Sequence, residues 1–589
     1  MNSTKAGPST SRIAIEPHGF ISGQEISDAA TGQPLCNRYL GVPYAQPPIG
    51  PRRWALPQPL PAGFSYSSQS CYDSFAPQCL QPKYRHQYSI DPPEPPRESE
   101  DCLYLNIWTP CGDPPEGGWP IWFQIHGGWL QTGDANQSPL KDLAHLIAPR
   151  DRAGMGLQCV VVFPAYRLNV FGFLGSDALD KEAGKGNFGF FDQRLALEWV
   201  HSHARSLGGN PSSITVSGLS AGAQSAHAQV LYEFSRAQQD ESYRPLIRRC
   251  LLRSGTAMLP PKSLEETRPQ LEELARCLDI EKQTASDRLQ TMRAVPAEKL
   301  VAAIDKLKMH TFRSVDDGGP AEGGFVSSSW AEDMRSGAFS RWCKKQGIAF
   351  MIGECANEDQ LYRLINPPNP TPSFGESLQL ELHNYYPLRT TEALLRAYAD
   401  ALPANTNKDS DAWATTFGRI TSDAQVFAAE RLLIRYLIRP DEGGLTQDDV
   451  LHYRLERRAG FLDEVMPRET GVYHGACEAV FLYMEEAILA QEQVGEAAAK
   501  TTARKDLSSF EEFCAPFLEW VRGRDQASVA KQWLTGSTGD TESVRTTAAG
   551  GASGRMRILR ADGRVEVARD PLEESKDSLI SALEKAIFA

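Results

Sequence analysis

The chain has 589 residues, 41% of them hydrophobic, and a formal net charge of −13. That apolar content is enough for a large core, and at about 150 residues per domain the length alone suggests about four domains, although a large α/β enzyme can form one extended sheet. The negative charge and the lack of Lys/Arg clusters exclude an obvious nucleic-acid-binding surface.

The N-terminal 20 residues contain no apolar stretch of signal-peptide length, and no apolar run reaches the ~18 residues that cross a bilayer. Twelve cysteines are too few for a disulfide scaffold, and no CxxC or Cys/His spacing typical of metal sites occurs. We therefore expect a cytoplasmic protein without a membrane span, and neither a metal nor an organic cofactor.

Six nearly continuous apolar runs are typical of strands buried on both faces of a mostly parallel sheet. They lie at residues 120–128, 158–167, 212–218, 248–255, 347–354 and 450–458. Between the second and the third, residues 190–209 carry apolar side chains at helical spacing and end in Gly-Gly, a helix stop. We expect residues 260–345 and 370–440 to be helix-rich insertions. The alternation of strands and helices predicts an α/β fold.

A glycine pattern, Gly184 to Gly189, matches the G-x-G-x-x-G of dinucleotide-binding proteins. The residues before it do not form a buried strand, which that fingerprint requires. We interpret the pattern as a turn that leads into the next helix.

Residues 214–227, ITVSGLSAGAQSAH, pass from a β-branched run through two glycines that bracket a serine into a run of small residues. In such a G-x-S-x-G turn, Gly218 and Gly222 avoid the collisions that a Cβ would cause between strand and helix. Ser220 Oγ then stands clear of the backbone, and the amide of Ala221 lies at a helix N-terminus, where negative charge is stabilised. The pattern predicts a nucleophile; the alternative is an ordinary Gly/Ser-rich turn.

A serine that accepts an acyl group needs a base, an acid that orients the base, and amides directed at the oxyanion. In α/β-hydrolase folds the order along the chain is Ser, then Asp or Glu, then His. The segment QIHGGWLQTG (124–133) supplies glycine amides after a strand, and MIGECANEDQLY (351–362) places Glu354, Glu358 and Asp359 beyond a strand end. Among eleven histidines, His474 in GVYHGACEAVF lies in a glycine-flanked loop at the right place in the order. Taken singly, each segment is also consistent with a glycine turn, a solvated acidic loop or a surface histidine.

Taken together, these segments resemble the type-B carboxylesterase family, which includes cholinesterases and liver-type carboxylesterases. The resemblance extends over most of the chain and includes YLGVPYAQPPIGPRRW, EDCLYLNIW, AYRLNVFGFLG, GNFGFFDQRLALEWV and ADGRVEVARDP in family order. It implies one α/β-hydrolase domain over residues 12–589, with a flexible N-terminus at residues 1–11. It also implies the following roles: nucleophile Ser220, acid Glu358, base His474, oxyanion-hole amides of Gly128, Trp129 and Ala221, and a disulfide between Cys79 and Cys102.

The sequence departs from the family pattern at several positions. Leu219 stands where an acidic residue usually precedes the nucleophile, Trp129 stands where a third loop glycine is common, and Asp359 replaces a glycine. No Trp lies between Cys79 and Cys102, where cholinesterases place an indole that binds choline. We expect the Trp129 indole to narrow the acyl pocket; the alternative is that it turns outward and packs against the LQTG loop.

The resemblance implies a serine carboxylic-ester hydrolase that acts on uncharged, largely apolar small-molecule esters through an acyl-enzyme. Two alternatives stay open. A lactonase or acyltransferase uses the same three residues, and a non-catalytic binding protein can share the same fold. The sequence leaves the oligomeric state undecided.

Overall fold

The computed structural model describes residues 10–588, apart from 29–30, 69–70, 84–95, 137–142, 150–155, 178, 180–184, 282, 405–407, 465, 483–496 and 536–553. Thr10 and Ser11, which we expected in a flexible N-terminus, belong to the first strand and pair with the second. The rest of that segment, residues 1–9, lies outside the described residues.

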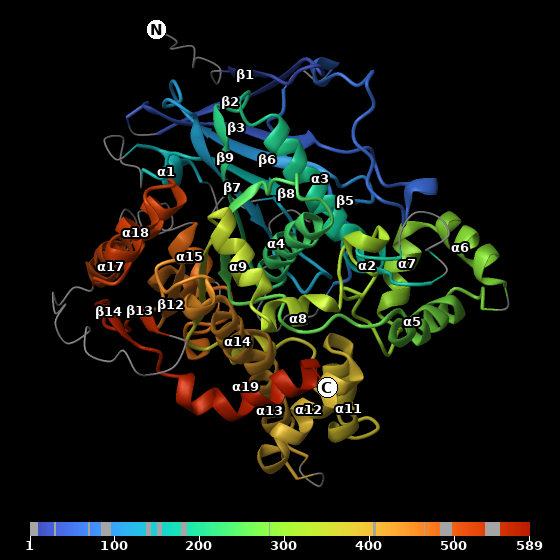
Figure 1. Cartoon of the computed structure of the whole chain (residues 1–589). Helices are drawn as coiled ribbons and strands as arrows, with labels where there is room; N and C mark the ends of the chain where they lie inside the picture. Colours follow the sequence, from blue (N-terminus) through green and yellow to red (C-terminus); the bar gives the residue numbers. More distant parts are fainter. Residues whose placement is uncertain are drawn as a thin grey trace.

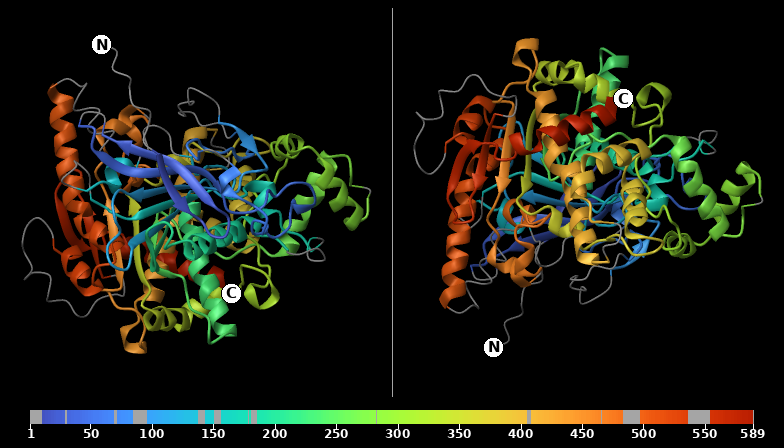
Figure 2. Two further views of the ribbon diagram at one scale, coloured as in Figure 1. Left: turned by 90° about the horizontal axis from the view of Figure 1, so that it is seen from above. Right: turned by 90° about the horizontal axis from the view of Figure 1, so that it is seen from below.

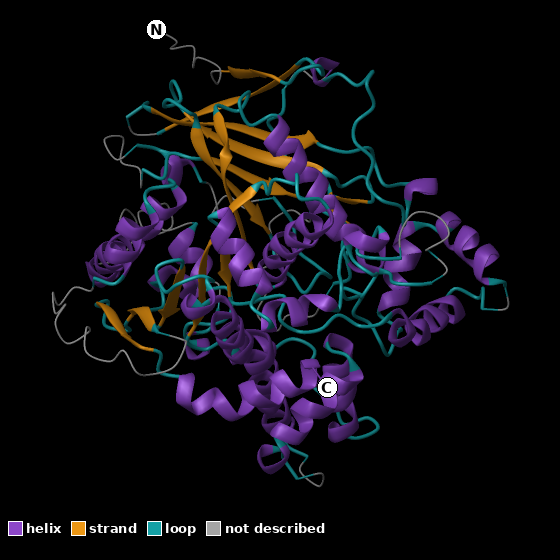
Figure 3. Cartoon of the chain, in the orientation of Figure 1, coloured by secondary structure: helices purple, strands orange, loops and turns teal. Residues whose placement is uncertain are grey.

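A twelve-stranded sheet forms the centre of the molecule (Figure 3). Its spatial order is β1-β2-β3-β6-β8-β7-β9-β10-β11-β12-β13-β14. The strands are β1 Thr10–Ala14, β2 Phe20–Ser27, β3 Pro34–Pro43, β6 Tyr104–Pro110, β7 Trp119–Ile125, β8 Val160–Pro164, β9 Gly209–Leu219, β10 Ile247–Arg253, β11 Ala349–Cys355, β12 Val450–Leu455, β13 Arg555–Leu559 and β14 Val565–Arg569. A separate pair consists of β4 Gln78–Cys79 and β5 Glu98–Ser99.

The six apolar runs of the sequence are the contiguous strands β8-β7-β9-β10-β11-β12, and each pairs in parallel with its neighbours in this group. The predicted mostly parallel sheet is therefore confirmed. Antiparallel pairing joins β1 to β2, β2 to β3, β3 to β6 and β6 to β8 at one side of the sheet, and β13 to β14 at the other. Antiparallel strands at the edges were not predicted, because they lack the continuous apolar runs that burial on both faces produces.

Helices cover both faces of the sheet (Figures 1 and 2). Their bounds are α1 Ala144–Ile147, α2 Asn169–Phe173, α3 Phe188–Ser202, α4 Ala221–Gln239, α5 Leu264–Cys277, α6 Ala285–Ala294, α7 Ala297–Ile304, α8 Ser329–Arg335, α9 Ala338–Gln346, α10 Asp359–Tyr362, α11 Phe374–Tyr385, α12 Leu388–Ala397, α13 Ser410–Ser422, α14 Ala428–Leu437, α15 Cys477–Phe481, α17 Ala497–Val521, α18 Gln526–Trp533 and α19 Glu573–Phe588. The expected insertions are helical: α5 to α9 fall within residues 260–346 and α11 to α14 within 370–440.

The helix expected at residues 190–209 is α3, which ends at Ser202 and is followed by turns up to Gly208. The described part of the G-x-G-x-x-G pattern, residues 185–189, leads directly into this helix. This arrangement agrees with our interpretation of the pattern as a turn. Residues 180–184 lie outside the part of the chain that the structure describes.

Two hydrophobic cores lie on opposite faces of the sheet, because side chains alternate along a strand. In β7, Ile121 and Phe123 belong to one core and Trp122 to the other. Side chains of α3 and α4 pack in the first core, and side chains of α17 and α18 pack in the second. In Figure 1, α3 and α4 accordingly lie on one side of the strands, while α17 and α18 lie on the other. Among the described helices, none combines the length and the apolar character that crossing a bilayer requires.

Candidate active site

The turn between β9 and α4 holds Ser220 in a strained conformation, with φ 59° and ψ −123°. A Cβ on Gly218 would lie 2.0 Å from the carbonyl carbon of Gly222, and one on Gly222 would lie 2.2 Å from Ile125 O. Glycine is therefore required at both positions, as the sequence predicted. The Ser220 amide donates to Arg253 O at the end of β10 (2.8 Å), which anchors the turn to the sheet.

In the loop after β7, hydrogen bonds to two carbonyl groups fix the orientation of the backbone amides of Gly128 and Trp129. Gly128 O accepts hydrogen bonds from the amides of Gln131 and Thr132, both at 2.9 Å. Since the C=O and N–H of a trans peptide point in opposite directions, the amide of Trp129 faces the other way. Gly127 O lies 2.9 Å from His126 Nδ1, which fixes the next peptide, and with it the amide of Gly128, in the same manner.

The Ser220–Ala221 peptide follows the same rule, because Ser220 O accepts from Gln224 N (3.0 Å) in the first turn of α4. The amides of Gly128, Trp129 and Ala221 donate no hydrogen bond to any residue that the structure describes. Gly127 lies directly against the turn, since a Cβ there would be 2.5 Å from Leu219 O. The loop and the helix N-terminus thus supply donors on neighbouring stretches of backbone, as an oxyanion requires.

Glu358 and His474 form a buried pair. His474 Nδ1 lies 2.5 Å from Glu358 Oε2, and the two side chains are 4% and 0% exposed. Glu358 Oε1 accepts from Ser254 Oγ (2.7 Å) and from Cys355 N (2.6 Å), so the carboxylate is held on both oxygens. Nε2, the other ring nitrogen of His474, is buried and has no hydrogen-bond partner in the described part of the chain. The loop of His474 reaches the serine turn, because a Cβ on Gly475 would lie 3.8 Å from the Leu219 side chain.

The structure separates the three acidic residues that follow β11. Glu354, within the strand, forms ion pairs with Arg431 (2.7 Å) and Arg454, so its carboxylate is already used. Asp359 is the first residue of α10 and accepts from Gln360 Nε2. Only Glu358 of the three contacts the histidine.

Asn357 joins the loop of Glu358 to the loop of His474. Its backbone N–H donates to Val472 O (3.0 Å), and its side-chain oxygen accepts from Val472 N (2.9 Å). A parallel β-bridge pairs Asn357 with Tyr473. Because these bonds lie within two residues of each member of the acid–base pair, they fix its separation through the backbone.

Two functional neighbours were missed by the sequence analysis. Ser254 contacts Glu358, but it follows β10, about 100 residues earlier in the chain. Glu430, on α14, accepts from Gly255 N (3.2 Å), and burial together with the carboxylates of Glu354 and Glu358 raises its pKa well above the usual range. The sequence analysis treated Ser254 only as part of an apolar run and Glu430 only as part of a helix-rich insertion, so neither was assigned to the site.

One cluster has the composition of a metal site. Ligand-type atoms of Glu354, Glu430 and His452 lie within 4.8 Å of one another. Both oxygens of Glu354 are bonded to arginines, and the Arg431 guanidinium supplies the positive charge that a metal would bring. These residues therefore do not fit a cation, which would meet a fixed positive charge.

Cys79 and Cys102, the pair for which the family resemblance implies a disulfide, are both buried free thiols. They lie next to each other: a hydrogen bond with Cys79 is the main cause that raises the Cys102 pKa, followed by burial. The structure thus brings the two sulfurs together, and the disulfide itself stays a prediction.

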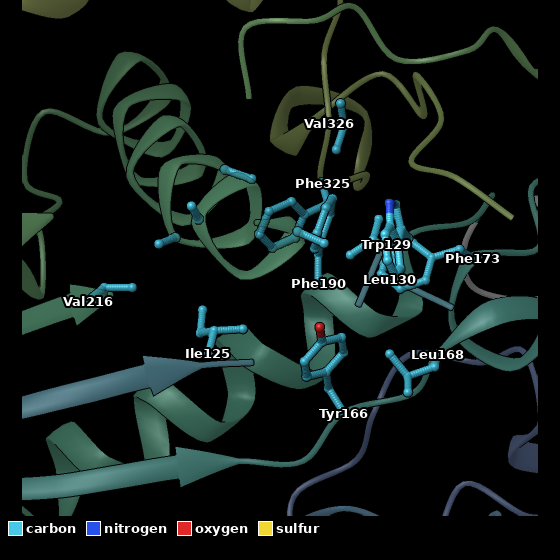
Figure 4. Packing of buried hydrophobic residues seen from close by; sticks show 14 of the residues in the cluster. Ile125, Trp129, Leu130, Tyr166, Leu168, Phe173, Phe190, Val216, Phe325 and Val326 are labelled. Atoms are coloured by element: carbon cyan, nitrogen blue, oxygen red, sulfur yellow. The ribbon is translucent and has the colours of Figure 1, made fainter. Parts of the chain in front are cut away.

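A pocket of about 30 Å³, with room for about two water molecules, adjoins the serine. Ser220, Ala221 and Trp129 all line it. The indole is 8% exposed, belongs to the core shown in Figure 4, and meets Tyr362 edge-on with 6.4 Å between ring centroids. Tyr362 in turn packs against the His474 ring (5.0 Å). The indole therefore packs within the core beside the acid–base pair, and its role in narrowing the acyl pocket stays a prediction.

This sheet, together with the strand–serine–helix turn, defines an α/β-hydrolase fold. Comparison with known proteins then specifies the family. The carboxylesterase family model matches residues 9–516. An esterase/lipase of Schizosaccharomyces pombe, described as uncharacterized, is 36% identical over 474 residues, which are 80% of this chain and 84% of the relative. A carboxylic ester hydrolase of Gibberella moniliformis is 36% identical over 469 residues, 77% and 80% of the two chains.

Liver carboxylesterase 1 of Oryctolagus cuniculus is 32% identical over 316 residues, 53% of this chain and 52% of the relative. The chain therefore belongs to the carboxylesterase family and is a serine ester hydrolase. This assignment does not favour a non-catalytic binding protein or an acyltransferase on the same fold.

Proposed function

We propose that the protein hydrolyses small carboxylic esters through an acyl-enzyme on Ser220, with His474 as the base and Glu358 as the acid that orients it. The observation that supports this proposal most directly is the buried Glu358–His474 pair. It leaves Nε2 as the only ring nitrogen of His474 without a described partner, beside the loop of the strained serine.

In the first half of the reaction, Ser220 Oγ attacks the ester carbonyl carbon and its proton passes to His474 Nε2. The carbonyl oxygen becomes an oxyanion, which the amides of Gly128, Trp129 and Ala221 stabilise by about 3 kcal/mol per donor. When the carbon–oxygen bond to the leaving alcohol breaks, that alcohol takes the proton from His474. Water then attacks the acyl-enzyme by the same route, which releases the acid and restores the serine.

Glu358 keeps the imidazole in the tautomer whose Nε2 accepts a proton, and it stabilises the imidazolium that forms. The bonds from Ser254 and Cys355 to Glu358 Oε1 hold the carboxylate in place, so that Oε2 stays on the histidine. A second cavity of about 210 Å³ provides room for the parts of the ester beyond its carbonyl group. It shares four lining residues with the pocket at the serine, namely Gln224, Leu259, Pro260 and Ser314.

Covalent labelling tests the assignment of the nucleophile. A fluorophosphonate probe should label the wild-type protein and not Ser220→Ala, while Ser242→Ala, at an exposed serine, should label normally. Labelling of a correctly folded Ser220→Ala variant would overturn the proposal. Product analysis with added alcohol distinguishes hydrolysis from acyl transfer, because a transferase forms a new ester.

A further inference from the structure

Two basic residues line the pocket at Ser220, namely Lys262 and Arg313. They belong to the insertion between β10 and β11. The described residues that line this pocket include no Asp or Glu. A positive pocket is notable in a chain whose net charge is −13, because the average field of the protein has the opposite sign.

Lys262 is only 4% exposed. Its ammonium donates to His383 O (2.6 Å) and Asn384 O (3.3 Å), two uncharged acceptors at the end of α11. Burial and the charge of Arg313 lower the pKa of Lys262 to about 7, and Glu266 opposes this shift. An ammonium has three N–H groups, so these two bonds leave capacity for a further acceptor.

Arg313 lies beside the pocket and contacts both sides of it. Nη1 donates to Trp129 O (2.8 Å) and Nη2 to Gln224 Oε1 (3.2 Å), so the guanidinium bridges the glycine loop and α4. The guanidinium carbon lies 5.8 Å from the centre of the Tyr385 ring. Arginine stays charged at all relevant pH values and, unlike lysine, binds carboxylates through a planar pair of donors.

We propose that the active site binds an ester that carries a carboxylate, such as the monoester of a short dicarboxylic acid, and that Lys262 and Arg313 recognise its negative charge in the pocket at Ser220. This inference rests on the proposed function and adds the substrate class. The larger neighbouring cavity differs in charge, since Glu266 and Asp316 line it, so the carboxylate binds in the pocket at the serine.

The proposal changes one expectation from the sequence. Uncharged substrates were expected because the groups that bind a cationic alcohol are missing. The pocket agrees on that point, since acidic residues are missing from its described lining. Its two cations extend the preference from neutral esters to anionic ones.

A pair of matched esters tests the proposal: p-nitrophenyl hemisuccinate, and p-nitrophenyl 4-methylpentanoate, in which an isopropyl group replaces the carboxylate. At pH 6.5, and after correction for spontaneous hydrolysis, we expect kcat/KM of the wild-type enzyme to be at least about tenfold higher for the hemisuccinate, as one charge-assisted contact implies. Lys262→Met should lower this ratio by about tenfold or more, through a higher KM for the anionic ester only. Lys299→Met, at an exposed lysine on α7, should leave the ratio unchanged.

A wild-type ratio of one or below would overturn the inference, as would an equal loss for both esters in Lys262→Met, which would indicate a structural role. If Lys262→Met does not fold, inhibition of the wild-type enzyme decides the question. Succinate should compete with substrate at least about tenfold better than its uncharged diamide, and equal inhibition would refute the proposal. Failure of the proposed function has a different signature: neither ester is hydrolysed, and the fluorophosphonate probe does not label Ser220.

Discussion

Replacing Trp129 with glycine tests whether this side chain limits the size of the acyl group. The residue has φ 58°, a conformation that glycine adopts without strain, and it lines the pocket of about 30 Å³. Removal of the indole should therefore enlarge the pocket while the amide keeps its place, since the Gly128 carbonyl that orients it is bound by Gln131 and Thr132.

The expected change in stability is the sum of opposing effects. Truncation of a buried Trp costs about 3–5 kcal/mol. Relief of the left-handed backbone returns about 1–2 kcal/mol. Removal of the indole N–H, which is buried without a described partner, returns about 1 kcal/mol. We thus expect Trp129→Gly to lose about 0–3 kcal/mol in urea unfolding and to remain folded at 25 °C.

The assay is kcat/KM over a series of p-nitrophenyl esters from acetate to decanoate. We expect Trp129→Gly to raise the rate for bulky acids relative to acetate by about tenfold or more, because each methylene that gains a place in an apolar pocket contributes about 0.8 kcal/mol. The matched control is Leu130→Gly, at a buried neighbour with φ 67° that does not line the pocket. It relaxes a similar strain, so its acyl profile should stay that of the wild type. If Trp129→Gly also keeps the wild-type profile, the indole does not limit the acyl group.

Three further predictions concern the acid–base pair and the cations. Glu358→Gln should lower kcat by roughly 10³-fold or more. Glu354→Gln leaves a buried arginine partly unpaired, so it should cost about 3–5 kcal/mol in stability while kcat of the folded protein is preserved. The opposite pattern in kinetics and urea unfolding would reassign the acid. Ser254→Ala removes the side-chain donor to Glu358 Oε1, so kcat should fall about tenfold with KM unchanged. Circular dichroism should show a folded variant, which a loss through misfolding would not allow. Burial and Arg313 lower the pKa of Lys262 to about 7, against the effect of Glu266, so the lysine is charged below that pH and neutral above it. The preference for the hemisuccinate should therefore decline between about pH 6 and pH 8 in the wild type and stay flat in Lys262→Met. Parallel profiles of the two proteins would exclude titration of this lysine.

Much of the fold follows from local sequence. The six apolar runs became the six parallel strands at the centre of the sheet, because a strand buried on both faces needs apolar side chains at nearly every position. The serine turn was equally predictable, since the atoms that exclude a Cβ at Gly218 and Gly222 lie within a few residues of the turn or on the adjoining end of β7. The edge strand β14 escaped prediction because an antiparallel edge tolerates polar side chains.

The residue pattern alone left three candidates for the acid, and the family resemblance selected Glu358. Glu354, Glu358 and Asp359 lie within six residues of one another, and their chemistry is the same. The arginines that neutralise Glu354 come from α14 and β12, about 80 and 100 residues further along the chain. Only the pairing of β11 with β12 and the packing of α14 decide which carboxylate reaches His474.

The same distinction applies to the pocket. Ser220 and Trp129 belong to motifs, whereas Lys262 and Arg313 lie in an insertion whose sequence indicates only charged helices. A turn is determined by contacts between neighbours in the chain, so residue types at fixed spacing predict it. The charge of a pocket depends on which distant segments fold against the turn, and long-range packing, rather than any local pattern, placed these two cations beside the serine.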